Sequence, residues 1–438
     1  MAGDKRGQDR HSIEFRITAG SSDKEIGYYC SKFEWVSFVN GGNRITASFK
    51  DTHQNILDEK MIKELLKHAK TEKGIDVEAR IWQHYERKRG KKTAKRKLKV
   101  LSLNSNLLGS ITEATLELVC IDAASWLLNR GKCDGHAYKG SIGGDDGVIA
   151  QIANKYSAPE KLNIKIDKTK DDKNNWWWDM RLDPKTVISS LIEWSASITD
   201  QETPMVIQCQ DFEFKCKEWS NLPPTKTNGK KFSVAHRKGH IQEWTDRGEL
   251  QILSNNLLSP AATRLYTGSI SATTGLYVDK GNSKESGGVL TPKQTYVNDK
   301  LSPNKLGPNI KADQGYSKPV GESATFIEPV PEHNNGDVGV LYQDYSVGRA
   351  RNWFMKTIYT TMRVKLTIEP GDTDFDDAFA CGRDRIFLEV ITLDKDFKPY
   401  YINGNWMLYG FRHMCDWEHW KTELLLCRIE HDAAKKSI

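Results

Sequence analysis

The sequence predicts an α+β protein that is predominantly β, with an antiparallel β-barrel module near each end. Short segments in which apolar and polar residues alternate dominate residues 1–120 and 346–438. Residues 121–220 combine helical with strand-like periodicity, which is typical of an α+β module. Residues 221–345 hold strand-like segments such as "RGELQILSN" (247–255), become rich in Gly, Pro, Ser, Asn and Lys at 281–321, and indicate an extended arm or connector with some strands. At 438 residues the chain is long enough for such a division, at roughly 100 to 200 residues per domain.

The first module, residues 1–120, is expected to consist of antiparallel strands and one amphipathic helix. In "KFEWVSFV" (32–39), Phe33, Trp35 and Ser37 share one face, and "NGGN" supplies the following turn. Helical periodicity follows at 55–73, and Gly74 is placed to end that helix. Further strands are expected at 13–18, 43–50, 75–86, 97–105 and 113–122.

The later modules follow from the same patterns. Helices are expected at 122–129, 145–157 and 183–198, the last capped by Asp183 with Pro184 in its first turn. A strand at 161–166 and a strand pair at 205–219 complete the middle module. In the last module a helix is expected at 344–362, and strands at 363–369, 384–394, 400–413 and 419–432.

The last two strands form an aromatic hairpin whose residue types suit a buried structural edge, a metal site or a docking surface. Alternate apolar residues on this hairpin predict a buried barrel face, and the family resemblance described below implies a subunit interface, with these members: Trp406, Leu408, Trp420, Leu424 and Leu426. His413 and Cys415 share a strand face, but His419 falls in the expected turn and Cys427 pairs with apolar neighbours. This arrangement does not favour tetrahedral metal ligation, and no metal is expected.

The positive charge is concentrated in "ERKRGKKTAKRKLK" (86–99), where nine of fourteen residues are Lys or Arg. The run falls between two strands, so it is expected at a hairpin tip. The candidate contact residues are Arg87, Lys88, Arg89, Lys91, Lys92, Lys95, Arg96 and Lys97. Such a tip fits phosphates, an acidic neighbouring subunit or plain solvation, and it contains no aromatic residue to stack on bases.

Signatures of catalysis are missing from the sequence. It contains no G-x-S-x-G, Walker loop, G-x-G-x-x-G after a strand, or H-E-x-x-H, and Glu193 has no identifiable partner carboxylate for glycoside hydrolysis. The acidic run "GDTDFDD" (371–377) lacks the Gly and Glu of a calcium loop and is expected to be a solvated turn. The eight cysteines are scattered, so reduced buried thiols are expected. No cofactor, signal peptide or membrane insertion is expected.

The order of modules resembles that of the baseplate hub proteins of contractile-tailed phages. This superfamily includes the late-control D proteins and the hub part of type VI secretion spikes. The resemblance rests on "RLDPKTVISSLIEWSAS" (181–197), "YSVGRARN" (345–352) and the terminal hairpin. The hairpin positions that fit are Gly404, Trp406, His413, Thr422, Leu424, Leu426 and Arg428. The resemblance spans most of the chain but is weak over residues 221–345.

The resemblance implies a structural, non-catalytic virion protein with two tail-tube-like barrel modules. It implies a homotrimer that joins a sixfold tail tube to a threefold central spike, contacts baseplate wedge proteins and leaves a channel for the genome. The basic tip would then face the lumen or a neighbour, with non-specific contact to passing DNA or the tape measure. Two alternatives stay open: a nucleic-acid-binding protein that acts through residues 86–99, and a cell-envelope-degrading tail enzyme.

Overall fold

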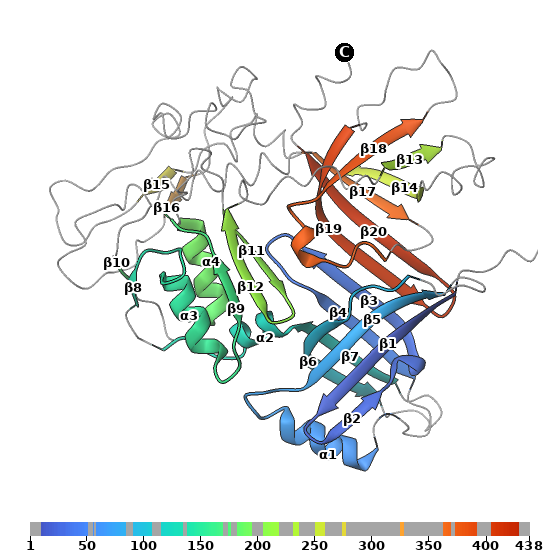
Figure 1. Ribbon diagram of the computed structural model, residues 1–438, viewed down its shortest axis with the longest axis horizontal. Helices are drawn as coiled ribbons and strands as arrows, with labels where there is room; N and C mark the ends of the chain where they lie inside the picture. The colour runs from blue at the N-terminus through green and yellow to red at the C-terminus, as the bar shows by residue number, and fades with distance from the viewer. Residues whose placement is uncertain are drawn as a thin grey trace, which may run out of the picture.

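A computed structural model gives the architecture of the chain (Figure 1). It describes residues 10–50, 56, 58–84, 91–106, 115–134, 138–169, 174–176, 182–194, 205–218, 231–235, 250–258, 274–276, 325–327, 362–368, 373–391 and 404–428. The described residues form mostly strands with few helices, and the largest sheet is predominantly antiparallel. The predicted β-rich α+β class is therefore confirmed.

The first strand group contains the strands expected from the alternating pattern. Its elements are β1 (Arg10–Ala19), β2 (Ser22–Glu25), η1 (Gly27–Tyr29), β3 (Cys30–Phe38), β4 (Arg44–Lys50), α1 (Glu59–His68), β5 (Asp76–His84), β6 (Arg96–Asn106) and β7 (Thr115–Asp122). Phe33, Trp35 and Ser37 of β3 are buried, as predicted, and the residues between them are more exposed. Side-chain alternation along a pleated strand accounts for this pattern.

Helix α1 is shorter than the predicted helix, because it begins at Glu59 and ends at His68, six residues before Gly74, and it buries less of its apolar face. The carboxylate of Asp58 accepts a hydrogen bond from the Met61 amide at 2.8 Å. Met61 and Leu65 enter the core, whereas Leu66 is 62% exposed. After the helix, Gly74 has φ +65°, and a side chain there would overlap the ring of Trp126.

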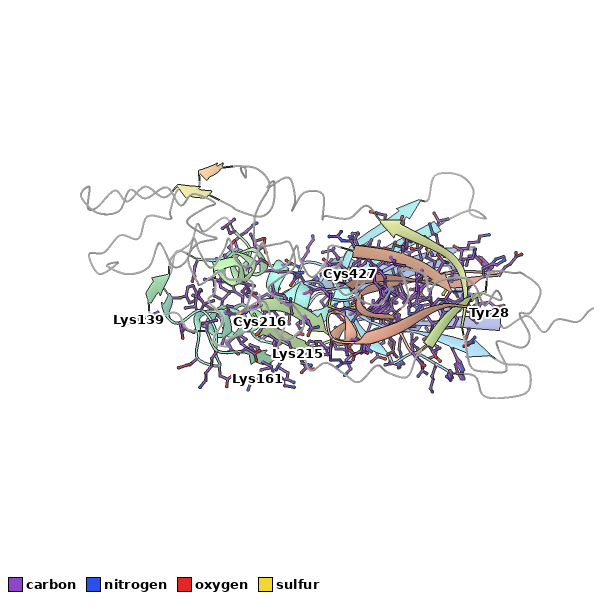
Figure 2. The ribbon with its side chains drawn as sticks, turned by 90° about the horizontal axis from the view of Figure 1, so that it is seen from above. Tyr28, Lys139, Lys161, Lys215, Cys216 and Cys427 are labelled. Atoms are coloured by element: carbon purple, nitrogen blue, oxygen red, sulfur yellow. The ribbon has the colours of Figure 1, made fainter. Side chains whose placement is uncertain are left out.

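The middle module forms a separate hydrophobic core from helices and short strands, drawn in green in Figure 1. Its elements are α2 (Ala123–Asn129), β8 (Tyr138–Gly140), α3 (Val148–Ser157), β9 (Asn163–Ile166), β10 (Asn174–Trp176), α4 (Pro184–Trp194), β11 (Met205–Gln210) and β12 (Glu213–Glu218). The predicted cap of α4 is present, because Asp183 accepts from the Thr186 amide at 2.9 Å. In Figure 2, Lys139 and Lys161 of this module lie at the opposite end of the molecule from Tyr28.

The second strand group recruits part of the expected connector. Its elements are β13 (Lys231–Ala235), β14 (Leu250–Leu258), β17 (Met362–Ile368), η6 (Ala378–Ala380), β18 (Arg385–Ile391), β19 (Gly404–Asp416) and β20 (Trp420–Arg428), while β15 (Thr274–Leu276) and β16 (Thr325–Ile327) pair separately. Strand β13 pairs with β18, and β14 pairs with β17. These two strands from the stretch expected to be an arm thus belong to the last sheet. The helix expected at 344–362 lies outside the described residues, except for Met362 at the start of β17.

Strand β19 joins the two groups into one thirteen-stranded sheet of order β18-β13-β14-β17-β20-β19-β3-β4-β7-β6-β5-β1-β2. One edge of β19 pairs with β20. The other edge pairs first with β18, over Gly404–Met407, and then with β3, over Gly410–Asp416. The two expected β-barrel modules are therefore not separate: their described strands form one continuous sheet, because the long strand β19 serves both groups.

Candidate functional site

The basic run continues the hairpin between β5 and β6, as predicted. The Gln83 amide donates to the Lys91 carbonyl at 2.9 Å, and the Thr93 amide donates to the Ile81 carbonyl at 3.0 Å. Thr93 is buried at this ladder, whereas Lys91 and Lys92 are exposed. Residues Arg87, Lys88 and Arg89 lie outside the described residues. The described half of the run is thus an ordered extension of the sheet that carries cations on its surface.

Two of the exposed lysines already have partners within the chain. Lys92 Nζ lies 5.3 Å from the ring centroid of Trp82, and Lys95 Nζ lies 2.8 Å from a Glu78 carboxylate oxygen. Both contacts are at the surface, where such pairs are individually weak. Lys97 is exposed as well. These side chains can therefore exchange their present partners for a phosphate or for the carboxylate of a neighbour.

Arg96 differs from the other basic residues because it is buried. Its Nη1 lies 3.4 Å from Asp211 Oδ2, and its Nη2 donates to the Asp376 carbonyl at 2.5 Å. Its guanidinium also faces the ring of Trp35. With 5% of its surface exposed, Arg96 is held inside the chain and cannot line a lumen or reach a partner. We therefore exclude it from the set of contact residues.

The base of the hairpin rests on the same two carboxylates. The Lys97 amide donates to Asp211 Oδ1 at 2.6 Å, and the Ala94 amide donates to Asp376 Oδ2 at 2.5 Å. Burial raises the pKa of Asp376, although Ala94 and Arg96 act in the opposite direction. Asp211 belongs to the β11–β12 turn, and Asp376 precedes η6. The hairpin, the middle module and the second group thus meet at one joint.

The acidic run around Asp376 is therefore not the solvated turn that the sequence predicts. Asp374 is exposed, but Asp377 caps η6 by accepting from the Phe379 amide at 2.9 Å. Arg383 pairs with Asp377 at 3.3 Å. The sequence of residues 371–377 is compatible both with a solvated turn and with a turn that packs against another part of the chain. Which of the two forms depends on the distant basic hairpin, which contacts Asp376.

A buried carboxylate, Asp122, lies at the same joint. It accepts hydrogen bonds from Asn43 Nδ2 at 3.0 Å and from the Asp211 amide at 2.9 Å, and also from the Asn43 amide. Asn43 in turn accepts from Trp35 Nε1 at 2.9 Å. Complete burial raises the pKa of Asp122 to about 7, against the effect of these donors. The network fixes the β3–β4 turn to the middle module.

The middle module is also clamped to η6 by two glutamines of β11. Gln208 Nε2 donates to the Cys381 carbonyl at 2.8 Å, and Gln210 Oε1 accepts from the Ala378 amide at 2.7 Å. Lys215 of the neighbouring strand β12, labelled in Figure 2, lies 3.3 Å from the centroid of the Phe379 ring. The middle module and the η6 segment of the second group are thus held together by side-chain contacts to backbone and ring atoms.

The aromatic hairpin forms an interior wall of the chain. Its five predicted members are all buried: Trp406, Leu408, Trp420, Leu424 and Leu426. Leu408 lies opposite Leu426 across the β19–β20 ladder. The predicted burial is confirmed, and the role of this hairpin in a subunit interface stays a prediction.

His413 on this hairpin is satisfied by hydrogen bonds rather than arranged for a metal. Its Nδ1 lies 2.8 Å from Thr422 Oγ1 and 3.3 Å from Trp420 Nε1, and its Nε2 lies 2.5 Å from the Phe375 carbonyl. The carbonyl requires an Nε2–H donor, so Nδ1 accepts from the other two groups. In the described ranges no three His, Cys, Asp or Glu side chains are grouped to hold a metal ion.

Comparison with known proteins identifies the fold. No protein-family model and no curated protein matches the sequence. Among solved structures, a tail protein from Neisseria meningitidis MC58 matches with a TM-score of 0.51 and 12% identity over 96% of this chain and 99% of that one. The 43 kDa tail protein of prophage MuSo2 from Shewanella oneidensis matches with a TM-score of 0.51 and 9% identity, over 97% and 99%.

A chain of the lidded PdpA–VgrG complex from Francisella matches with a TM-score of 0.51 and 10% identity. It is longer, since the match covers 97% of this chain but 54% of that one. The two tail proteins are matched over nearly their whole length, so the likeness includes both strand groups and the middle module. The chain accordingly has the fold of these tail proteins, which agrees with the fold that the resemblance implies.

Proposed function

We propose that this protein is a structural virion component, a trimeric baseplate hub that joins the sixfold tail tube to the threefold central spike. The observation that carries the proposal is the shared fold with two tail proteins over at least 96% of this chain and 99% of theirs. A structural role also agrees with the joint formed by Arg96, Asp211 and Asp376, whose charged side chains contact other parts of the same chain. In the described residues, no helix is long and apolar enough to span a membrane.

The two strand groups suggest how a threefold protein meets a sixfold tube. Each chain would contribute two tube-like modules, so that three chains present six modules around a ring. In the second group the pairings return from β19 to β18, which favours a barrel-like closure of that module. The β19–β3 pairing would fix the angle between the two modules of one chain. Tail tube, spike and wedge proteins are the proposed partners, around a channel for the genome.

The basic hairpin is proposed as a contact to a neighbour, to the lumen or to passing DNA or tape measure. Its described candidates are Lys91, Lys92, Lys95 and Lys97, which are exposed. Arg87, Lys88 and Arg89 belong to the same proposal. Because the base of the hairpin is held by Asp211 and Asp376, the tip would be presented in a fixed direction.

The mass and symmetry of the purified protein test this function. Light scattering and negative-stain class averages should give three times 49.8 kDa and a threefold ring with a central opening, alone or with tail partners. A stable monomer in the presence of those partners would refute the hub. DNA binding by that monomer, lost when the hairpin lysines become Gln and weakened steeply by salt, would then favour the nucleic-acid-binding alternative.

A further inference from the structure

The sheet has a second face, here called the open face, that is opposite the hydrophobic core. Alternate residues of the central strands β17, β20, β19, β3 and β4 point to it, and they are more exposed than the residues between them. Its central members are Lys365, Thr367, Glu423, Leu425, Arg412, Met414, Glu34, Val36, Thr46 and Ser48. Because β19 pairs with β3, this face continues from the second strand group into the first.

A chain of ion pairs crosses the open face from one group to the other. Lys365 Nζ lies 2.7 Å from Glu423 Oε1, and Arg412 Nη1 lies 3.4 Å from Glu423 Oε2. On the other side, Arg412 Nε lies 3.0 Å from Glu34 Oε1. The four side chains come from four neighbouring strands and carry no net charge together. Their exposed fractions, from 16% to 39%, show that water reaches them.

The carboxylates of Glu34 and Glu423 contact the charged groups of Arg412 and Lys365 that would otherwise be available to a ligand. Interaction with Glu34 raises the pKa of Arg412, so its guanidinium stays charged but is paired. Lys421 and Arg44 are further cations on this face and keep it mildly basic. Small or uncharged side chains such as Val36 and Thr46 fill the positions between them. A surface of this kind attracts a polyanion weakly and offers few free phosphate contacts.

Resting on the hub function proposed above, we propose that the open face lines the central channel and that Glu34 and Glu423 keep Arg412 and Lys365 from holding double-stranded DNA. A channel wall built by both modules requires a polar surface that is continuous across both, and the open face has this property. The opposite face is filled by the hydrophobic core. DNA that has to pass through the channel then meets basic side chains whose charge is already compensated within the sheet.

Site-specific labelling tests the placement. Thr46→Cys puts a thiol on the open face, and Glu59→Cys puts one on α1, whose Met61 and Leu65 pack into the core from the other side. Seven of the eight native cysteines are buried and Cys30 is partly buried, so a maleimide gold cluster should react mainly at the new thiol. In averaged images of the ring, the label at position 46 is expected inside the opening and the label at position 59 at the outer rim.

The labelling experiment distinguishes two outcomes: that the lumen assignment is wrong, and that the proposed hub function is wrong. A ring that carries the position-46 label on its outside would overturn the lumen assignment and leave the hub standing. If no ring forms with tail partners present, the channel itself is refuted and the inference falls with it.

DNA binding tests the compensating carboxylates in the full chain. The double variant Glu34→Gln/Glu423→Gln is compared with Glu59→Gln/Glu72→Gln, which removes the same charge from exposed sites near α1. A fluorescent duplex titrated at several salt concentrations should bind the first variant on the order of tenfold more tightly than wild type. The salt dependence should steepen by about two counterions. An equal gain in the control, or no gain in a folded Glu34→Gln/Glu423→Gln protein, would overturn the proposal.

Discussion

Replacing Arg96 by Met should destabilise the joint between the three parts of the chain. The substitution keeps an unbranched side chain against Trp35 but removes the ion pairs to Asp211 and Asp376 and the hydrogen bond to the Asp376 carbonyl. Removing one partner of a buried pair typically costs about 3–5 kcal/mol, because the other charge stays buried. Here the Asp211 and Asp376 side chains remain 30% and 21% exposed, so water screens them in part. We expect a loss of about 2–3 kcal/mol.

The loss should grow with pH. Burial already raises the pKa of Asp376, and removing the guanidinium raises it further. A carboxyl whose folded-state pKa exceeds its unfolded value contributes most to stability at low pH, and that contribution is lost as pH rises. In the Met variant, protonation of Asp376 relieves the unpaired charge as pH falls, so the variant and wild type are compared at about pH 5 and about pH 8. The free-energy difference from wild type is thus larger at the higher pH.

Urea unfolding followed by circular dichroism at both pH values measures this difference. Lys95→Met is the matched control, because Lys95 belongs to the same run and pairs with Glu78 at the surface. That exposed pair is worth about 0–1 kcal/mol, so the control should stay close to wild type. Equal losses for the two variants, or a loss at Arg96 below about 0.5 kcal/mol, would refute the assignment of Arg96 to the joint.

Three further predictions follow from buried groups. Because the pKa of Asp122 is raised to about 7, the free energy of unfolding of wild type should fall between about pH 4 and about pH 7. In urea unfolding, Asp122→Asn should lack this pH-dependent fall, and identical pH profiles would contradict the assignment. Gly410→Ala would place a Cβ 2.7 Å from the Ser37 carbonyl and should lose about 1–3 kcal/mol in thermal unfolding, whereas Gly131→Ala, with no atom within 4 Å, should be near neutral. Thiol titration should find little reaction in the native protein and eight reactive thiols in urea. The reason is that burial raises the pKa of the thiols, that of Cys30 to about 12, so few thiolates are present. Rapid reaction of the native protein would show an open core.

The local elements were largely predictable because their signals lie within a few residues. The alternation at Phe33 and Trp35 and the Asp183 cap of α4 follow from short-range sterics and hydrogen bonding. The burial of the C-terminal hairpin followed from the same alternation. Such features are decided before the rest of the chain is placed, so a single sequence is enough to find them.

Strand partners and the joint could not be found this way. Within the basic run, Arg96 is indistinguishable from Arg87 or Lys97 until Asp211 and Asp376 are placed beside it. The pattern at 247–255 predicts a strand where β14 begins, but nothing local indicates β13 or shows that these strands pair with β17 and β18 across more than a hundred residues. Their partners depend on tertiary packing, to which local composition gives no guide.

The two strand groups are coupled where β19 changes partners, and this coupling bears on the proposed role. Between Leu408 and Gly410 the register shifts, and Gly410 lies opposite Phe38 at the first β3 pair. Gly410 lacks a side chain at a point where a Cβ would overlap the Phe38 ring, so the backbones can pair closely. Sliding one strand group past the other would break the β19–β3 ladder and, at the same time, separate Arg412 from Glu34. A tail hub has to keep its two modules at a fixed angle while the tube and the spike load it from opposite sides, and a shared strand resists that shear better than a flexible linker would.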